Sequence, residues 1–342
     1  MKAVVLYGPK DVKISDFTEP ALLDNGVKVA VSYCGLCGTD FHKYLGKAGS
    51  RKVTYPVPLG HEISGVVVEV GKKVTRFKVG DRVTVDPNWS CGNCYYCKNG
   101  KSHLCSNSKG VVKGLAEYVC PPEENVYIIP DTLSLKNASL CEPVSCCLHG
   151  VDLLEVKQGE SVAVVGCGAI GGLIISILKA TGAGKIIAID TNEEKRESSI
   201  SLGANYFINP ATCDVNKAIS DLGIECVDKV IECVGVPVTA NLALSIAGRG
   251  AIVVLFGVCD PETQLSIKWY EAFTKELVIK TSYINPFTTQ RAITLLNNGV
   301  INTDISISSV ISMEEVTTEL ETREKSRNGK VIVAVNSNLD KE

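Results

Sequence analysis

Short alternating runs of hydrophobic and polar residues dominate the first 130 positions of the chain. The runs VKVAVSY at 27–33, ISGVVVEVG at 63–71 and DRVTVD at 81–86 are rich in valine and are separated by glycine, proline and charged residues. Alternation of this kind, broken by turn residues, is typical of β-strands that bury one face. This part of the sequence therefore predicts a mostly-β unit built from short strands.

The pattern changes at about residue 160. The apolar run SVAVV at 161–165 leads into a glycine-rich turn, then into the helix-like LIISILKATGAG and the strand-like KIIAID. Further apolar runs at 229–235 and 251–258 flank a helical TANLALSIAG segment. Buried strands that alternate with helices predict a doubly wound parallel sheet.

After about residue 283 the pattern becomes irregular again and ends in the strand-like KVIVAV at 330–335. We expect this tail to return to the first unit, so that the parallel-sheet unit is an insertion. The fold class predicted is α/β, with one domain from residues 1–148 and 286–342 and a second from residues 149–285. A length of 342 residues agrees with about two domains.

Charge and hydropathy exclude several classes of partner. The net charge of −3 gives no electrostatic footprint for nucleic acid or an anionic membrane. No run approaches the roughly 20 apolar residues that span a bilayer, and the amino terminus lacks the long apolar stretch of a signal peptide. We therefore expect a cytoplasmic protein whose 15 cysteines stay reduced unless a metal binds them.

The glycine-rich turn matches a dinucleotide-binding fingerprint. Gly166, Gly168 and Gly171 form G-x-G-x-x-G between a predicted strand and a predicted helix. Such glycines permit a tight turn and close approach of a pyrophosphate to the helix amino end. Asp190 ends the next strand, 19 residues beyond Gly171, where a carboxylate binds ribose hydroxyls and repels a 2′-phosphate. The motif therefore predicts NAD rather than NADP.

Four cysteines lie in the polar, turn-rich segment CGNCYYCKNGKSHLC. A disulfide knot disagrees with a cytoplasmic location, and a redox pair requires one isolated C-x-x-C. The spacing C-x2-C-x2-C-x7-C is suited to tetrahedral thiolate coordination of zinc, and a closed shell of four sulfurs is structural. The predicted ligands are Cys91, Cys94, Cys97 and Cys105.

A third group of metal-binding residue types is dispersed along the chain. Cys37 lies in CGLCGTDFH, His61 in GHE, and a carboxylate comes from Glu62 or from Glu142 in CEPVSCCLHG. Together they would make an open, catalytic-type zinc site. Spacing alone does not assemble these residues, because a lone His–Glu pair is usually a surface pair and a lone cysteine is often a core thiol.

The whole chain resembles the zinc-containing medium-chain dehydrogenase/reductase family, and most closely its sorbitol (polyol) dehydrogenase-like branch. The resemblance rests on CGLCGTDFH, GHEISGVVVEVG, VGDRV, the four-cysteine loop, the EP pair, GCGAIG and GKVIV, in the order of the family. It implies a GroES-like catalytic domain, a Rossmann domain, NAD and two zinc ions per chain, one catalytic and one structural.

The resemblance also implies roles for the dispersed residues. Cys37 and His61 fall on catalytic zinc ligands, Glu62 binds the metal or lies just behind it, and Glu142 falls on a ligand position. The Cys37 thiolate and one carboxylate neutralise zinc, whereas a second carboxylate would leave the site at −1. We therefore expect one glutamate to be bound and the other to lie at the edge.

Catalytic steps follow from the same resemblance. Zinc lowers the pKa of the substrate hydroxyl, Thr39 takes the alcohol proton, and His42 ends the proton relay. The substrate carbon then gives hydride to the nicotinamide. The cofactor contacts implied are Gly166, Gly168, Ala169, Ile170, Gly171, Asp190, Val234 and Gly257.

The substrate region departs from the family pattern. Sorbitol-type members carry an Arg-Tyr pair near the SYIN stretch, where this chain has Ser282 and Tyr283. The loss of the arginine weakens the case for sorbitol and leaves a shorter diol or another polyol open. The sequence predicts a zinc-dependent, NAD-linked dehydrogenase of secondary alcohols that forms a homodimer or homotetramer. The alternatives are a threonine dehydrogenase-type or other alcohol dehydrogenase of this family and, in another class, a zinc-knuckle binding or sensor protein.

Overall fold

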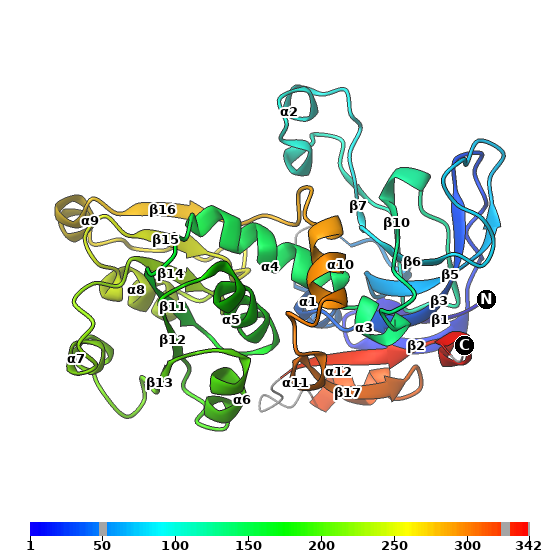
Figure 1. The fold of residues 1–342 in the computed structure, drawn as a ribbon. Coiled ribbons are helices and arrows are strands. Elements are labelled where there is room, and N and C mark those ends of the chain that lie inside the picture. The colour runs from blue at the N-terminus through cyan, green and yellow to red at the C-terminus, as the bar shows by residue number, and fades with distance from the viewer. Residues whose placement is uncertain (48–52, 323–328, 341–342) are drawn as a thin grey trace.

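A computed structural model describes residues 1–47, 53–322 and 329–340. The chain forms two halves joined by the long helix α4 (Cys141–Leu154), which lies between them (Figure 1). One half contains the first 140 residues together with the carboxyl-terminal segment, and the other contains the segment between them. Residues 332–334 of the carboxyl-terminal segment pair with residues 33–35 of the first half.

The first half is built on β-strands. In the described residues its main sheet has the order β10-β6-β5-β3-β18-β17, with β9 paired to β3, and a smaller sheet has the order β2-β1-β4. The strands are β1 (Lys2–Gly8), β2 (Asp11–Asp16), β3 (Val27–Gly35), β4 (Val57–Pro58), β5 (Glu62–Val70), β6 (Arg82–Val85), β9 (Tyr118–Val119), β10 (Val126–Ile128), β17 (Ile307–Ser312) and β18 (Lys330–Ala334).

Strand β3 is the centre of this sheet because nearly every side chain of VKVAVSYCG is buried. It pairs with β5 and with β18, both antiparallel. Short helical segments close the unit: α1 (Gly38–Tyr44), η2 (Glu123–Asn125), α3 (Leu135–Ala138), α10 (Thr289–Asn297), α11 (Thr303–Ser306), α12 (Val316–Thr322) and η3 (Ser337–Asp340).

The second half is a parallel sheet with the order β13-β12-β11-β14-β15-β16. Its central strand, SVAVV, is buried along its whole length, as parallel strands covered on both faces require. The strands are β11 (Ser161–Val165), β12 (Lys185–Ile189), β13 (Tyr206–Ile208), β14 (Lys229–Glu232), β15 (Ile252–Leu255) and β16 (Val278–Thr281). The predicted doubly wound sheet is confirmed.

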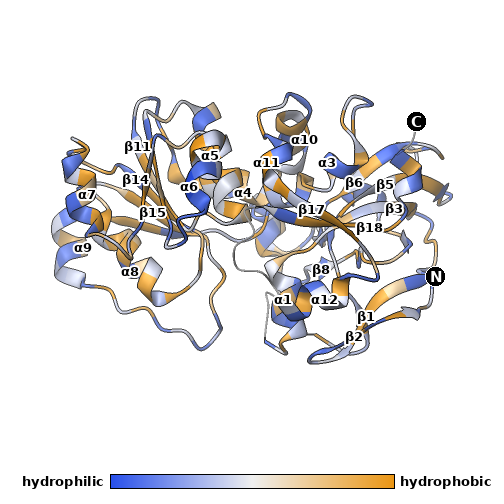
Figure 2. Ribbon diagram, turned by 90° about the horizontal axis from the view of Figure 1, so that it is seen from below, coloured by the Kyte–Doolittle hydropathy of each residue, from blue (hydrophilic) through white to orange (hydrophobic). Residues whose placement is uncertain are grey.

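The helices of this half are α5 (Ala169–Thr181), α6 (Lys195–Leu202), α7 (Val215–Asp221), α8 (Pro237–Ile246) and α9 (Trp269–Lys275). Figure 2 shows hydrophobic residues along the central strands β11, β14 and β15, whereas the surrounding helices contain both hydrophobic and hydrophilic residues. The strand order reverses between β11 and β14, and ligands of such sheets bind at the carboxyl ends of the strands at this point. Among the described residues, no helix is long and apolar enough to cross a membrane.

Candidate metal and cofactor sites

The four-cysteine segment forms a lobe that projects from the β-rich half, where α2 is drawn in Figure 1. It is built from very short elements, so its own hydrophobic core cannot fix it. They are β7 (Asn88–Trp89), α2 (Tyr95–Lys98), η1 (Ser102–Leu104) and β8 (Lys109–Gly110). A lobe of this kind needs another source of stability.

The sulfur positions in the lobe fit one tetrahedral metal ion. The Sγ–Sγ distances are 3.5 Å for Cys94–Cys97, 3.8 Å for Cys94–Cys105 and 3.5 Å for Cys91–Cys105. Four sulfurs placed about 2.3 Å from a tetrahedral zinc lie about 3.8 Å apart. A disulfide bond holds its sulfurs at about 2.05 Å, and all four cysteines are free thiols.

The pKa values of the cysteines in the lobe also indicate a site for a metal cation. Backbone N–H groups of Asn93 and Cys94 lower the pKa of Cys91 to about 6. Burial and the neighbouring thiols raise the pKa of Cys97 to about 11. The thiols therefore compete for negative charge when no cation is bound, and a divalent cation would allow all four to ionise.

The second metal-binding group forms where two paired strands end. Cys37 lies just beyond β3, and His61 lies just before β5. Because β3 and β5 pair antiparallel with Gly35 opposite Glu62, the end of one strand meets the start of the other. Three potential ligand atoms, one each from Cys37, His61 and Glu62, lie within 4.8 Å of one another.

A buried aspartate ties the two ligand-bearing segments together. Asp40, which is fully buried, accepts the backbone N–H of Cys37 through Oδ2 at 3.1 Å. Through Oδ1 it accepts the backbone N–H of Gly60, directly before His61, also at 3.1 Å. Asp40 therefore fixes the spacing between the thiol and the imidazole.

Glu62 offers one free oxygen to this group. Its Oε1 accepts a hydrogen bond from Lys330 Nζ at 2.5 Å. Its Oε2 is buried and has no hydrogen-bond partner among the described residues. A buried oxygen without a partner is costly, and beside a thiol and an imidazole it is suited to a metal cation. The residues present therefore fit a catalytic-type zinc.

Glu142 lies near this group, in the first turn of α4, and is buried. Its pKa is raised to about 8, chiefly by burial and also by Glu62 and Cys37, although His61 acts in the opposite direction. Cys146 Sγ donates to Glu142 Oε1 at 3.5 Å. The tight group of ligand atoms contains Glu62 and not Glu142 among the described residues.

The two predicted proton-transfer residues lie on α1, which begins at the metal-binding cysteine. Thr39 is half-buried, and its Oγ1 lies 3.6 Å from Cys37 Sγ. His42 is half-buried one turn further along the same helix. Both residues therefore lie on the helix that begins at Cys37, and the Thr39 hydroxyl is next to the metal-binding sulfur.

The glycine turn has the geometry of a phosphate-binding turn. Gly166 has a φ of +92°, which favours glycine, and a Cβ there would lie 2.4 Å from Val234 Cγ2. A Cβ on Gly171 would lie 2.0 Å from Gly166 O, so only glycine lets α5 approach β11 this closely. Gly168 is the N-cap of α5, and Ala169 and Ile170 form its first turn.

The remaining predicted cofactor residues follow neighbouring strands. Asp190 comes directly after β12, and its Oδ2 accepts the backbone N–H of Cys167 at 2.7 Å. Lys195 Nζ lies 3.3 Å from the same oxygen. Val234 and Gly257 follow β14 and β15, so all of these residues gather at the carboxyl edge of the sheet.

The predicted substrate residues follow the outermost strand, β16. Ser282 Oγ is buried and lacks a hydrogen-bond partner among the described residues, whereas Tyr283 is exposed. Asn285, which is buried, accepts at Oδ1 from Asn88 Nδ2 at 2.8 Å. The segment after β16 is thereby fastened to the base of the cysteine lobe.

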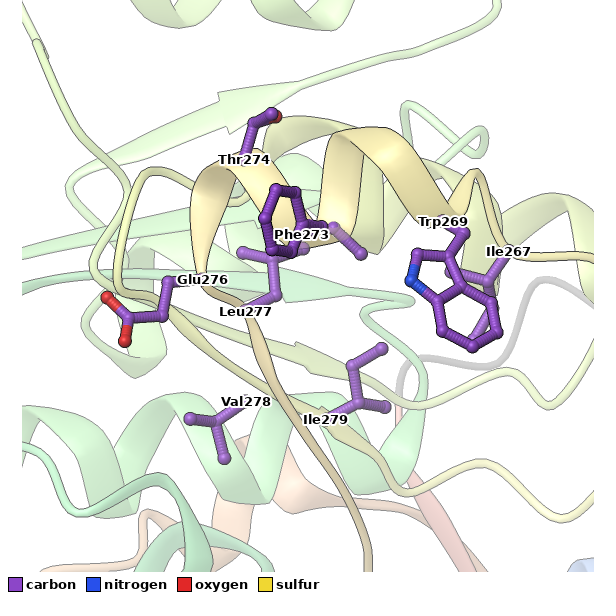
Figure 3. A pocket seen from close by; sticks show the side chains of 9 residues that line it. Ile267, Trp269, Phe273, Thr274, Glu276, Leu277, Val278 and Ile279 are labelled. Carbon is purple, nitrogen blue, oxygen red and sulfur yellow. The ribbon is translucent and has the colours of Figure 1, made fainter.

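A large hollow of about 750 Å³ lies elsewhere, between α9 and β16. Figure 3 shows its mostly apolar lining, which includes Trp269, Phe273 and Ile279. None of the predicted metal, cofactor or substrate residues lines it. It is therefore separate from the chemistry described above.

Sequence reasoning missed Asp40, Lys195, Asn285 and Lys330. Lys195 had a signal, since it lies only five residues after Asp190 in the sequence. Asp40 lies inside the CGLCGTDFH motif, but nothing in the sequence indicates that it accepts hydrogen bonds from backbone N–H groups. Lys330 and Asn285 had no local signal, because their partners are 268 and 197 residues away.

Comparison with known proteins places this arrangement in context. Residues 24–131 match the family Alcohol dehydrogenase GroES-like domain, and residues 169–298 match the family Zinc-binding dehydrogenase. Sorbitol dehydrogenase of Bacillus subtilis is 30% identical over 94% of this chain and 93% of its own length. (R,R)-butanediol dehydrogenase of the same organism is 33% identical over 93% and 94%.

A solved structure from Sinorhizobium meliloti, described as a zinc-binding dehydrogenase bound to NADP, superposes with a TM-score of 0.92. It is 36% identical and covers 98% of this chain and 99% of its own. The agreement extends over both halves, so the relative arrangement of the two sheets is shared as well.

Proposed function

Because this chain belongs to the zinc-containing medium-chain dehydrogenase/reductase family, in its polyol dehydrogenase-like branch, we propose that it oxidises a secondary alcohol with NAD to give a ketone. The substrate class is a polyol or diol. The observation that carries this proposal is the group of Cys37, His61 and the partnerless Glu62 Oε2. The test is NADH formation with a panel of secondary alcohols. A metal-replete protein that oxidises no polyol or diol would contradict it.

Two zinc ions per chain are proposed. Cys91, Cys94, Cys97 and Cys105 would hold a structural ion, since they fill all four tetrahedral positions. Cys37, His61 and Glu62 would hold a catalytic ion and leave a position for substrate, with Glu142 at the edge of the site. When bound, the catalytic ion would polarise the substrate hydroxyl and lower its pKa.

Residues of the chain itself would then transfer the proton and keep the metal-binding segments in place. Thr39, beside Cys37, is the proposed first group of a proton relay: its hydroxyl oxygen accepts the substrate proton while it donates its own onward, and His42 on the same helix is the proposed group that releases a proton to solvent. Asp40 keeps the segments that carry Cys37 and His61 at a fixed distance. Fixed geometry of this kind is what proximity catalysis requires.

NAD is the proposed cofactor, bound by the glycine turn with its adenosine ribose beside Asp190. Support comes from the carboxylate, which would repel the 2′-phosphate of NADP. Lys195 acts in the opposite direction because it places a cation 3.3 Å from that carboxylate. Because a similar solved structure is bound to NADP, measuring the preference of this protein for NAD over NADP tests the proposal directly.

The domain division proposed is residues 1–148 with 286–342 for catalysis and residues 149–285 for the cofactor. Its support is that the first boundary falls within α4 and the second follows β16. Substrate specificity is assigned to Ser282 and Tyr283, because they stand in the segment that joins the halves.

A homo-oligomer is proposed, in the cytoplasm, where the free thiols remain reduced. Its support is the surface formed by α9 and β16. Strand β16 ends the parallel sheet on one side, and Trp269 and Phe273 beside it are 83% and 71% exposed. An unpaired edge next to exposed aromatic residues is typical of an interface. Light scattering tests it, and a monomer at all concentrations would contradict it.

A further inference from the structure

We propose that Lys330 is a positioning residue of the metal site, whose buried ammonium holds one oxygen of Glu62 and directs the other toward the metal. This inference rests on the proposed zinc function and extends it. It also assigns Lys330 a second task, which is to supply the counter-charge of the buried Glu62 carboxylate when no metal is bound.

The contacts of Lys330 reach both ligand-bearing segments. Its Nζ donates to Glu62 Oε1 at 2.5 Å and to the carbonyl oxygen of Leu36 at 2.9 Å. Leu36 directly precedes Cys37, and Glu62 directly follows His61. One ammonium therefore braces the strand end that carries the thiol against the strand start that carries the imidazole.

The location of Lys330 makes this brace rigid. Lys330 opens β18, which pairs antiparallel with β3, and its side chain is only 5% exposed. The side chain of Glu62 is 1% exposed. Since the ammonium occupies Oε1, the carboxylate can offer only Oε2 to a metal, and Oε2 is the oxygen that lacks a partner. Glu62 is thereby prepared as a ligand through one oxygen.

The pair also predicts how the protein without open-site metal behaves. Glu62 and Lys330 neutralise each other before zinc binds, so the empty site does not bury a lone carboxylate. If Lys330 is replaced by methionine, Glu62 has no counter-charge until zinc arrives. The variant should therefore be destabilised more strongly without zinc than with it.

The experiment compares thermal unfolding with the open site stripped by gentle chelation and then reloaded with zinc. The lobe zinc is retained in both states, as checked by metal analysis. In Lys330→Met, we expect the rise in Tm on zinc addition to exceed that of the wild type by about 5 °C or more. An equal or smaller rise in Lys330→Met would overturn the role of Lys330 as the counter-charge of Glu62.

A matched control is Lys229→Met. Lys229 is also a buried lysine with a carboxylate partner, Glu160, at 3.7 Å, but it lies in β14 of the parallel sheet. Its loss should lower Tm equally with and without open-site zinc. A wild-type protein whose Tm does not respond to zinc would contradict the proposed function itself, which separates the two failures.

A second measurement serves if Lys330→Met does not fold without metal. The double variant Glu62→Gln/Lys330→Met removes both charges, so it should be more stable without open-site metal than the sum of the two single losses predicts. Additive losses would overturn the pairing. The positioning role is tested in Co²⁺-loaded protein. Lys330→Met should shift the visible ligand-field bands, whereas Lys229→Met should leave them unchanged. Unshifted bands in Lys330→Met would overturn the positioning role.

Discussion

The Asp190 carboxylate accepts the backbone N–H of Cys167 at 2.7 Å, directly across the glycine turn. Cys167 stands between the first two glycines of the fingerprint, so this bond joins the end of β12 to the phosphate-binding turn. The acid that is predicted to select the cofactor therefore also shapes the turn that would bind its pyrophosphate.

Replacing Asp190 by alanine should erode the preference for NAD. The variant loses the ribose-binding carboxylate and leaves Lys195 without its partner, so a 2′-phosphate meets a cation instead of an anion. The ratio of kcat/KM for NAD to that for NADP should fall by roughly tenfold or more, equal to about 1.4 kcal/mol. Asp214→Ala, which removes an exposed helix cap on α7, is the control. An unchanged ratio in Asp190→Ala would exclude Asp190 as the selecting residue.

The cysteine lobe should depend on its metal for stability. Cys94→Ser removes one of four ligands from a lobe that has almost no core, so the loss in unfolding free energy should exceed about 4 kcal/mol. Metal analysis should fall from about two zinc ions per chain toward one. Cys259→Ser, at an exposed free thiol, should change neither quantity. Full stability and full zinc content in Cys94→Ser would rule out a structural metal in the lobe.

Substrate preference should respond to Ser282. Arginine at this position would add a planar cation with several donors, which can hold the hydroxyls of a long polyol. In Ser282→Arg, kcat/KM for hexitols relative to a short vicinal diol should rise about tenfold. Ser282→Ala should leave the ratio unchanged, because the hydroxyl has no hydrogen-bond partner among the described residues. If wild-type protein oxidises sorbitol as efficiently as the best diol, Ser282 does not set specificity.

Stability without open-site metal should fall as the pH rises through neutrality. Burial raises the pKa of Glu142 to about 8 from 4.5. Between these values only the folded state retains the proton, so unfolding releases it and becomes easier as the pH rises. Below about 4.5 both states are protonated, and above about 8 neither is. Urea unfolding between pH 5 and pH 8 should show this slope in wild type relative to Glu142→Gln. Parallel curves would contradict the raised pKa.

Much of the architecture could be predicted because its signals are local. The valine-rich strand at 27–33 and the buried strand at 161–165 occur where their patterns place them. The glycine fingerprint is equally local, since its glycines are needed for a positive φ at Gly166 and for close packing at Gly171. Each of these features is set by neighbours in the sequence.

The second layer of the metal site could not be predicted in the same way. Lys330 meets Glu62 only because β18 returns to pair with β3 after the whole parallel-sheet unit has been formed. Asp40 contributes through backbone N–H groups, which have no sequence signature. The choice between Glu62 and Glu142 likewise depends on this packing, and spacing along the chain left it open.

The central claim, that open-site zinc enables alcohol oxidation, is tested most directly by zinc titration of activity. Protein stripped of open-site metal is titrated with zinc while NADH formation from a vicinal diol is followed, with polyols and L-threonine assayed in parallel. We predict negligible turnover before addition, and a linear recovery that ends at about one added zinc per chain. Full NADH formation by protein that metal analysis shows to lack the open-site zinc would contradict the account.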